Sequence, residues 1–399
     1  MHYFLLDLLR GLAALWVFAF HFHFSEKFIA TFPHLHILLK QGDLGVPMFF
    51  VISGYCITAS ARSTIRREEK TSRFLYRRLR RIYPPFWISI IIVASVPFLT
   101  ELISSVKTGS YTPPTSLGNN LGYLNYTVFE WIRLTTLTQV FWPVENANSL
   151  QAKFTTINAV YWTLAIEVQF YLVVALSLSL SRRFLYSLLL VVTVSCLILS
   201  SLGISAKTGL FIPYWQMFAI GVLLCFAMEK GWSLGGSKLQ STKFIRTLSP
   251  LILIIGVVTF IVRCLNGYEP SWILFSVFFA SSLWLVKPYD ETLKKLSENR
   301  YLKSLFTPLI CLGAISYTLY LLHDRLQFLT AQLVRQVFEI NSIIYDMSVT
   351  LVTCILCWPI YLLFEAPFVK SKSSNERNST LSQEASCSDE IYPEAPSKS

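Results

Sequence analysis

Four ionisable side chains lie within one apolar stretch near the amino terminus. The stretch is LDLLRGLAALWVFAFHFHF, and it contains Asp7, Arg10, His21 and His23. Ionisable groups at membrane depth are costly and usually mark a functional pathway. An imidazole, with an ordinary pKa of about 6.5, can take a proton from a hydroxyl near neutral pH. One of the two histidines is therefore a candidate general base.

Helical geometry separates the two histidines. Eleven residues from Arg10 to His21 turn about 1100°, three turns plus roughly 20°, and advance about 16 Å. Asp7 lies one turn before Arg10, whereas His23 points roughly the other way. Because His21 shares a face with Arg10 and His23 does not, His21 is the favoured candidate for the base. The alternative is that Asp7 and Arg10 reach toward lipid headgroups and that the histidine is interfacial.

A second charged group follows in FLYRRLRRIYPPFW, where four arginines occupy five positions. On a helix Arg78 and Arg81 share a face, as do Arg77 and Arg81. Guanidinium groups capture phosphate in two-pronged fashion, so the cluster suits coenzyme A, which carries a pyrophosphate and a 3′-phosphate. A lipid phosphate, or membrane topology alone, would also account for it.

A carboxylate interrupts the apolar run YWTLAIEVQFYL. Glu167 lies one helical turn from both Thr163 and Tyr171, so the three form a stripe. A carboxylate at this depth must pair or take up a proton. Glu167 is expected to orient His21, to pair with Arg10, to bind a sugar hydroxyl, or to form a structural pair between helices.

A late run, LGAISYTLYLLHDRL, carries Tyr317, Tyr320 and His323 after Ser316. Tyr320 and His323 lie one turn apart, so their polar groups could bind an acceptor together. Tyrosines at a membrane boundary also serve as interfacial anchors, and that alternative stays open.

A glycine-rich run, GDLGVPMFFVISGYCIT, contains Gly42, Gly45 and Gly54. Glycine allows close approach of helices, so packing is the first expectation. Ser53 and Tyr55 could supply hydroxyls to a pantetheine arm or to an acceptor. Ser53 is not expected to be a nucleophile, because no base accompanies it in the sequence.

The composition indicates a membrane protein. Of the 399 residues, 53% are hydrophobic and only 14% are charged. Apolar runs approach the roughly 20 residues that cross a bilayer. We predict an all-α polytopic bundle of about ten spans, at residues 6–24, 44–61, 82–103, 156–180, 184–204, 209–228, 248–265, 271–286, 306–323 and 343–364.

The distribution of basic residues predicts the orientation. The net charge is +11, and the basic residues lie between the apolar runs, which favours membrane topology over binding of nucleic acid. If both termini are cytoplasmic, the inner loops hold 20 Lys and Arg and the outer loops hold 8. The positive-inside rule therefore predicts cytoplasmic termini.

Residues 1–369 are predicted to form one transmembrane domain, and residues 370–399 a disordered, Ser- and Glu-rich cytoplasmic tail. The segment 131–144 is too short for a span and is expected to be interfacial or re-entrant. Cys354 and Cys357 are spaced C-x-x-C inside an apolar run, without the polar neighbours of a zinc site. We therefore predict no metal site.

Together these motifs resemble the acyltransferase-3 family of membrane O-acyltransferases, which acetylate polysaccharides, lipid-linked sugars and some small molecules. The similarity spans residues 4–368, and the motifs come in family order. The matches are Arg10 with His21, GDLGVPMFFVISGYCIT, Arg78 with Arg81 before IYPPFW, YWTLAIEVQFYL, LGAISYTLYLLH, and FEAPF near the end. One departure is HDRL, because many relatives have Pro shortly after the residue that corresponds to His323.

The resemblance implies an acyltransferase in the cell (inner, or cytoplasmic) membrane. Acetyl-CoA would be the donor, entering from the cytoplasm, and a hydroxyl of a carbohydrate or glycolipid would be the acceptor. Whether transfer is direct or passes through an acyl-histidine stays open. Spacing and resemblance together predict catalytic roles for His21, Arg10 and Glu167, donor-binding roles for Arg78, Arg81, Arg77, Ser53 and Tyr55, and acceptor-binding roles for Tyr171, Tyr317 and His323.

Two other classes of function fit parts of the sequence. A transporter of an anionic solute would also use intramembrane Arg, His and Glu, although it needs no arginine cluster for coenzyme A and would often show internal repeats. A membrane sensor could recruit partners through the Ser-rich tail.

Overall fold

The computed structural model describes residues 3–110, 123–141, 157–203, 209–230, 243–267 and 271–369. The predicted tail therefore lies outside the described residues, as does the end of the segment 131–144. Within the described ranges every regular element is a helix. The elements are α1 Phe4–His21, α2 Glu26–Thr31, α3 Pro33–Leu39, η1 Gly42–Leu44, α4 Gly45–Arg66, α5 Thr71–Thr108, α6 Val128–Thr135, η4 Gln139–Phe141, α8 Tyr161–Leu180, α9 Leu185–Ser201, η6 Ile212–Tyr214, α10 Trp215–Lys230, α11 Lys243–Leu265, α12 Trp272–Val286, η9 Lys287–Tyr289, α13 Asp290–Glu298, α14 Lys303–Val334, α15 Ile343–Phe364 and α16 Ala366–Val369.

The long helices form one bundle, which confirms the predicted fold class. Among the described residues, eight helical segments are long and apolar enough to cross a membrane. Two further apolar helices, Leu185–Ser201 and Pro250–Leu265, are shorter. Each of the ten predicted spans overlaps one of these ten segments.

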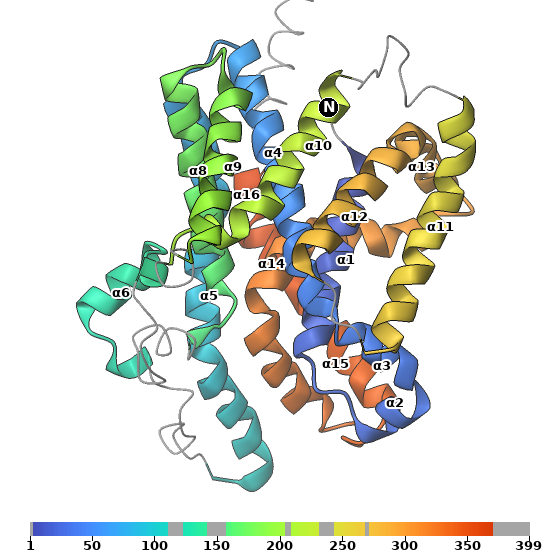
Figure 1. Cartoon of the computed structure of the whole chain (residues 1–399). Coiled ribbons are helices and arrows are strands. Elements are labelled where there is room, and N and C mark those ends of the chain that lie inside the picture. The colour runs from blue at the N-terminus through green and yellow to red at the C-terminus, as the bar shows by residue number, and fades with distance from the viewer. Residues whose placement is uncertain are drawn as a thin grey trace, which may run out of the picture.

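The helices point alternately toward two ends of the bundle. One end, here called the arginine end, carries the start of α1, the connection between α4 and α5, and α13, whereas α2 and α3 cover the other end (Figure 1). We call that other end the histidine end, because α1 finishes there at His21. The alternation is what the predicted topology requires.

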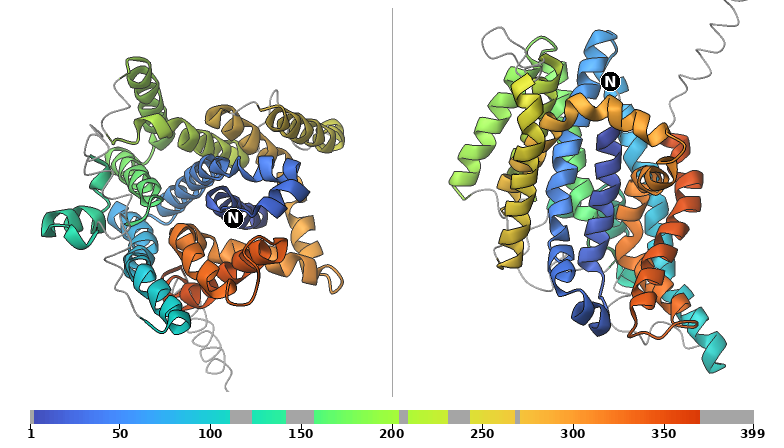
Figure 2. Two further views of the ribbon diagram at one scale, coloured as in Figure 1. Left: turned by 90° about the horizontal axis from the view of Figure 1, so that it is seen from below. Right: turned by 90° about the vertical axis from the view of Figure 1, so that its right-hand side faces the viewer.

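Helix α1 lies in the middle of the bundle, between α4 on one side and α14 and α15 on the other (Figure 2). Its first turn is fixed by α13, because the carboxylate of Asp290 accepts hydrogen bonds from the backbone amides of Phe4, at 3.2 Å, and Leu5, at 3.0 Å. These amides have no partner within their own helix, so Asp290 acts as a cap supplied by another element.

Glycines set how closely α1 and α14 approach. A Cβ atom on Gly11 would lie 2.5 Å from the backbone nitrogen of Gly313, and one on Gly313 would lie 2.5 Å from the carbonyl oxygen of Asp7. Backbone atoms cannot move aside as a flexible side chain can. Only glycine at both positions therefore allows this contact, which holds the two helices in register.

The glycine-rich run of α4 packs as expected. A Cβ on Gly54 would lie 2.2 Å from the carbonyl oxygen of Phe218 in α10, and one on Gly45 would lie 2.8 Å from that of Ala13 in α1. Helix α4 is thereby held against both α1 and α10. The packing interpretation of these glycines is confirmed.

The segment predicted to be interfacial forms α6 and η4, which lie to one side of the bundle (Figure 1). Two side chains of α5 bind the end of α6. Tyr83 donates to the carbonyl of Thr136, and the indole of Trp87 donates to that of Thr135, both at 3.0 Å. Helix α6 has eight residues, too few to span a membrane.

Candidate active site

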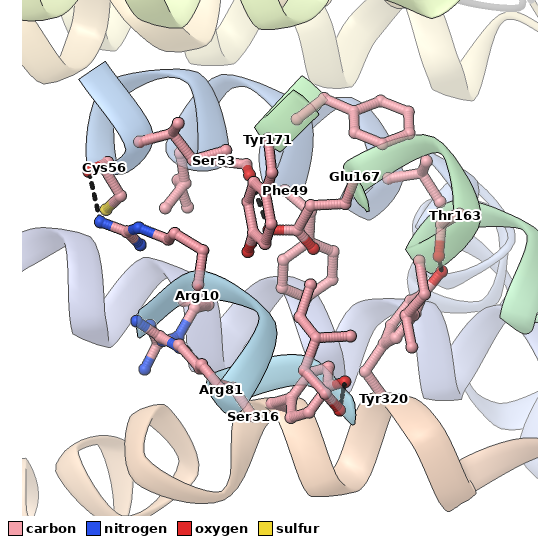
Figure 3. Close-up of a pocket in the computed structure, with 18 residues that line it drawn as sticks. Arg10, Phe49, Ser53, Cys56, Arg81, Thr163, Glu167, Tyr171, Ser316 and Tyr320 are labelled. Carbon is pink, nitrogen blue, oxygen red and sulfur yellow. Dashed lines mark hydrogen bonds between the residues drawn. The ribbon is translucent and has the colours of Figure 1, made fainter. Parts of the chain in front are cut away.

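A cavity lies inside the bundle between α1, α4, α5, α8 and α14 (Figure 3). It contains about 850 Å³ of space between atoms, counting its open mouth, but only about 100 Å³ has room for the centre of a water molecule. It is thus narrow, although it lies within the size range of ligand pockets. Its lining consists of Arg10, Val46, Phe49, Phe50, Ile52, Ser53, Cys56, Ile57, Arg78, Arg81, Ile82, Thr163, Leu164, Glu167, Tyr171, Ser316, Tyr317 and Tyr320.

The four clustered arginines divide by the face of α5 on which they lie. Arg78 and Arg81 line the cavity, inside the bundle rather than at its surface. Arg80 donates to the carbonyl of Pro367, and Arg77 points toward the connection between α4 and α5. The sequence predicted the cluster, but it did not show that half of it faces inward.

Arg10 lies beside the same cavity and is tied to α14. Its Nε donates to the hydroxyl of Ser316 at 2.8 Å, and its Nη2 donates to the carbonyl of Gly313 at 3.2 Å. The carboxylate of Asp7 lies 3.6 Å away. These contacts fix the guanidinium toward the arginine end of the cavity.

Arg78 and Arg81 differ in how they are bound. Arg78 donates from Nη2 to the carbonyl of Cys56 at 2.9 Å. Arg81 faces the cavity with no hydrogen bond or ion pair to the described residues, although Glu167 and Glu365 act on it electrostatically. A cation in such a place costs solvation free energy, which an anionic ligand would restore.

Glu167 joins α4 to α8 across the cavity. Its Oε1 accepts hydrogen bonds from the hydroxyls of Ser53 and Tyr171, each at 2.8 Å. The sequence left open whether Glu167 orients His21, pairs with Arg10 or binds other groups. The structure gives it these two hydroxyl partners instead.

Tyr320 closes the cavity on the side opposite the arginines. Figure 3 shows Tyr320 and Thr163 at one end, with Arg10 and Arg81 at the other. The hydroxyls of Tyr320 and Thr163 lie 2.8 Å apart, and the Tyr320 ring packs edge-on against Phe49 at 5.1 Å between centroids. The centroid of the His323 ring lies 5.8 Å from that of the Tyr320 ring. Neither His323 nor His21 is among the residues that line the cavity.

His21 and His323 form a pair at the histidine end. Nε2 of His323 lies 3.3 Å from Nδ1 of His21, and the ring centroids are 5.0 Å apart. His323 is fully buried, with 0% exposure, whereas His21 is partly exposed. The pair is built from α1 and α14, the two helices that the glycine contact holds together.

The hydrogen bonds assign the protons of the pair when both rings are neutral. Nδ1 of His323 lies 2.8 Å from the carbonyl oxygen of Tyr320, which can only accept, so this nitrogen carries the proton. Nε2 of His323 is then an acceptor for Nδ1–H of His21, which also faces the carbonyl of Val17 at 3.0 Å. Nε2 of His21 is left without a proton, as a general base requires.

Other predicted residues take the following places. Tyr317 lines the cavity and donates to the carbonyl of Ile82 at 3.0 Å. Tyr55 is buried outside the cavity lining, and its ring packs against Tyr3 at 6.3 Å. His23, which the helical phase disfavoured, is exposed.

Arg77 does not line the cavity. It forms an ion pair with Glu69 and donates to the hydroxyl of Thr64 at 2.9 Å. Glu69 lies between two candidate spans, and the hydrogen bond from Arg77 holds the pKa of its carboxyl below the ordinary value. Arg77 thus stabilises the connection that leads into α5.

Sequence reasoning assigned no role in the site to Ser316 or Phe49. Ser316 receives Arg10, and Phe49 packs on Tyr320. A serine and a phenylalanine in apolar runs give no distinctive signal. Only the contacts between helices reveal their positions. Glu365, in the FEAPF motif, accepts from the amide and hydroxyl of Thr318 at 3.2 and 2.6 Å.

A family model described as an acyltransferase domain matches residues 4–362. The chain belongs to the acyltransferase-3 family. The match covers nearly all of the described bundle, from the first turn of α1 to the last turns of α15, so the cavity and the histidine pair both belong to the acyltransferase domain.

Curated relatives of this acyltransferase-3 member include two O-acetyltransferases. The peptidoglycan O-acetyltransferase OatA of Listeria monocytogenes is 29% identical over 172 residues, which are 42% of this chain and 23% of the relative. The O-acetyltransferase OatA of Staphylococcus aureus is 31% identical over 157 residues, which are 37% of this chain and 22% of the relative. The aligned part is thus under a quarter of each relative. No solved structure matches the chain at a significant level.

Among the described residues, no group of three or more His, Cys, Asp or Glu side chains comes together in a way that could hold a metal ion. The polar groups that do come together are guanidinium, carboxylate, hydroxyl and imidazole groups. Such a set can bind an anion and move a proton.

Proposed function

We propose that this protein is a membrane O-acetyltransferase that moves an acetyl group from acetyl-CoA to a hydroxyl of a carbohydrate or glycolipid. Its arginine end faces the cytoplasm, as the distribution of Lys and Arg favours. The protein is a multi-pass protein of the cell, or cytoplasmic, membrane. Family membership supports the acyltransferase class over a transporter of anions.

The donor's phosphates bind at the arginine end of the cavity. Arg10, Arg78 and Arg81 face a lining that contains a single carboxylate, Glu167. Arg81 has its donors free for a ligand, whereas Arg10 and Arg78 are held in place by bonds to the protein. Guanidinium groups bind phosphate oxygens in pairs, which suits the pyrophosphate or 3′-phosphate of coenzyme A.

The thioester lies toward the histidine pair. Arg10 and His21 are about 16 Å apart along α1, a separation that the long pantetheine arm can bridge. Tyr320 and Phe49 lie on this route, because they close the cavity before the histidines. The Tyr320 ring must therefore move for the acetyl group to reach His21.

Transfer then requires a base and a dry site. Nε2 of His21 takes the proton of the acceptor hydroxyl, and His323 holds the His21 ring in the reactive tautomer. The hydroxyl oxygen forms a bond to the thioester carbon, the carbon–sulfur bond breaks, and the proton passes to the leaving thiolate. Exclusion of water matters because hydrolysis of acetyl-CoA competes with transfer.

One observation carries the proposal: a cavity with three arginines at one end finishes at Tyr320, and His323, which is paired with His21, packs against the ring of Tyr320. The sequence expectation that one face of α1 links Arg10 to His21 agrees with this arrangement. An acid–base pair beside a phosphate-binding cavity suits an acyltransferase that uses coenzyme A.

The test is reconstitution of the full chain in proteoliposomes with radiolabelled acetyl-CoA and a panel of glycans and glycolipids. We expect the wild type to transfer label and His21→Ala to lose transfer at equal membrane abundance. The matched control is His23→Ala, which removes an exposed imidazole from the same region and should retain transfer. Equal transfer by wild type and His21→Ala would refute the proposed base.

The same assay without acceptor distinguishes direct transfer from an acyl-enzyme. Direct transfer predicts no label on the protein, because His21 only moves a proton. Label on wild-type protein that is absent from His21→Ala would indicate an acetyl-histidine intermediate. Flux of a solute without turnover of acetyl-CoA would favour a transporter.

A further inference from the structure

A second cavity opens between α14 and α15, away from the arginine cavity. It contains about 1100 Å³ of space between atoms, counting its open mouth, of which about 490 Å³ has room for the centre of a water molecule, and nearly all of its surface is apolar. Helix α1 contributes its floor at Leu15, and α2 closes it at Phe28. We call it the α14–α15 groove. It is lined by Leu15, Phe24, Phe28, Pro308, Cys311, Leu312, Ile315, Asp346, Met347, Thr350, Leu351, Cys354, Ile355 and Trp358.

The mouth of the groove faces the hydrocarbon of the membrane. Met347, Leu351 and Ile355 line it, and each is more than half exposed on the outside of α15, a candidate membrane span. From Asp346 to Trp358 the groove follows twelve residues of helix, or about 18 Å. This length and the apolar lining fit a hydrocarbon chain.

The groove has one charged end. Asp346 is only 1% exposed, and its Oδ2 accepts from the amide and hydroxyl of Ser25 at 3.1 and 2.7 Å. Its Oδ1 has no hydrogen-bond partner among the residues that the structure describes. A buried carboxylate oxygen without a donor is unfavourable, so a ligand with a hydroxyl group would satisfy it. The negative charge disfavours a phosphate at the same point.

The charged end lies at the histidine end of the bundle. Ser25, which binds Asp346, follows His21 by four residues, directly after α1 ends. A lipid whose chain occupies the groove would therefore place its polar head at the histidine end. The apolar remainder of the groove runs from there toward the arginine end.

We propose that the α14–α15 groove binds the hydrocarbon chain of a glycolipid acceptor, whose hydroxylated head lies at Asp346 close to His21. This inference rests on the proposed function, because it gives that function a lipid-borne acceptor. It commits to a neutral, hydroxyl-bearing head, in keeping with the unpartnered carboxylate oxygen.

Photocrosslinking tests the binding without requiring turnover. The full chain in phosphatidylcholine liposomes is exposed to a dodecyl glucoside that carries a diazirine in its alkyl chain. We expect labelled peptides from α14 and α15, with competition by dodecyl glucoside and none by methyl glucoside. Cys354→Trp fills the groove and should lower labelling at least tenfold. Leu363→Trp, on an exposed part of the same helix outside the groove, should leave it unchanged.

Asp346→Asn tests the polar end. It keeps the side-chain volume, and its amide oxygen can still accept from Ser25, but its nitrogen donates where a carboxylate oxygen would accept. Labelling by the glucoside probe should fall severalfold, whereas labelling by a diazirine alkane should not change. Unchanged glucoside labelling in both Cys354→Trp and Asp346→Asn would overturn the inference. Equal labelling of the groove by a diazirine phosphatidylcholine would overturn its selectivity for the acceptor.

The acetyl-transfer assay separates this inference from the proposed function. If both hold, dodecyl glucoside is acetylated with a lower KM than methyl glucoside, and Cys354→Trp removes the difference. Groove labelling without transfer to any acceptor would refute the proposed function and leave the lipid site. Equal transfer to both glucosides with an unlabelled groove would refute the lipid site alone.

Discussion

Nε2 of His323 lies 3.3 Å from Nδ1 of His21, although 302 positions separate the two residues. The contact gives His323 a more specific task than the acceptor binding that its sequence context suggested. It holds the His21 ring through Nδ1. The lone pair of His21 Nε2 therefore points away from His323 and remains available to accept a proton. His323 is thus expected to be a positioning residue for the base.

The first prediction concerns this positioning. His323→Ala should lower kcat about 10- to 100-fold and change KM for acetyl-CoA less than about twofold, because a misaligned base slows proton transfer. His323→Gln keeps an acceptor for the Nδ1–H of His21 and should recover part of the rate. Steady-state kinetics at equal protein abundance measure both. No recovery with Gln and a raised KM would indicate direct substrate contact instead.

The second prediction concerns the free guanidinium of the cavity. Arg81→Ala should raise KM for acetyl-CoA by about tenfold to a hundredfold, the worth of one or two charge-assisted hydrogen bonds. The KM of Arg81→Lys should lie between those of the wild type and Arg81→Ala, because an ammonium group cannot bind phosphate in two-pronged fashion. The measurement compares acetyl-CoA with acetyl-pantetheine, which lacks phosphate.

Rates with acetyl-pantetheine should be the same in wild type and Arg81→Ala. Arg80→Ala is the matched control, since Arg80 lies on the same helix but binds the carbonyl of Pro367, and it should leave both donors unaffected. An equal loss with both donors would mean that Arg81 acts on the acetyl group or on the fold, and the phosphate assignment would fail.

The third prediction separates structure from chemistry at Glu167. Glu167→Gln keeps an oxygen that can accept from Ser53 and Tyr171, so abundance should be normal and activity should fall less than about fivefold. Glu167→Ala leaves both hydroxyls without their acceptor and should destabilise the protein by about 1–3 kcal/mol. Thermal unfolding in detergent and initial rates measure the two effects. A loss of activity of about 10²- to 10⁴-fold in Glu167→Gln would instead identify Glu167 as a proton-transfer group.

The fourth prediction concerns the contact between α1 and α14. Gly11→Ala would bring its Cβ to 2.5 Å from backbone atoms of α14, so the helices must separate. We expect a loss of about 1–3 kcal/mol and a fall in transfer, because Arg10 and His21 then lose their partners on α14. Gly256→Ala is the control, since the three atoms nearest its Cβ would all belong to the side-chain ring of Phe278, which can move aside more easily than backbone. Equal melting temperatures for the two variants would contradict the argument.

The fifth prediction concerns pH and the connection between α4 and α5. The pKa of Glu69 is lowered in the folded protein by Arg77, so the ion pair adds stability above the unfolded value of about 4.3. That stability is lost as the pH falls through the lower folded pKa. Arg77→Ala should therefore lower the melting temperature slightly at pH 7 and progressively less below about pH 4. KM for acetyl-CoA should stay unchanged in Arg77→Ala. A raised KM would instead support the donor-binding role that the sequence predicted for Arg77.

The sequence alone determined the local features. Long apolar runs predicted where the spans lie, because crossing a bilayer requires about 20 apolar residues whatever the neighbouring helices do. Helical periodicity placed Arg10 and His21 on one face, since the angle per residue is fixed by the backbone. The motifs in their order indicated the family, and the glycine-rich run indicated close packing.

Only the tertiary structure decided which side chains meet. It turned Arg78 and Arg81 toward the cavity and Arg77 toward Glu69, gave Glu167 its two hydroxyl partners, and joined His323 to His21. These outcomes depend on the distance and rotation between helices far apart in the chain, here set by backbone contact at glycines such as Gly11. Helical periodicity fixes the face of each helix, but it carries no information about which other face lies opposite.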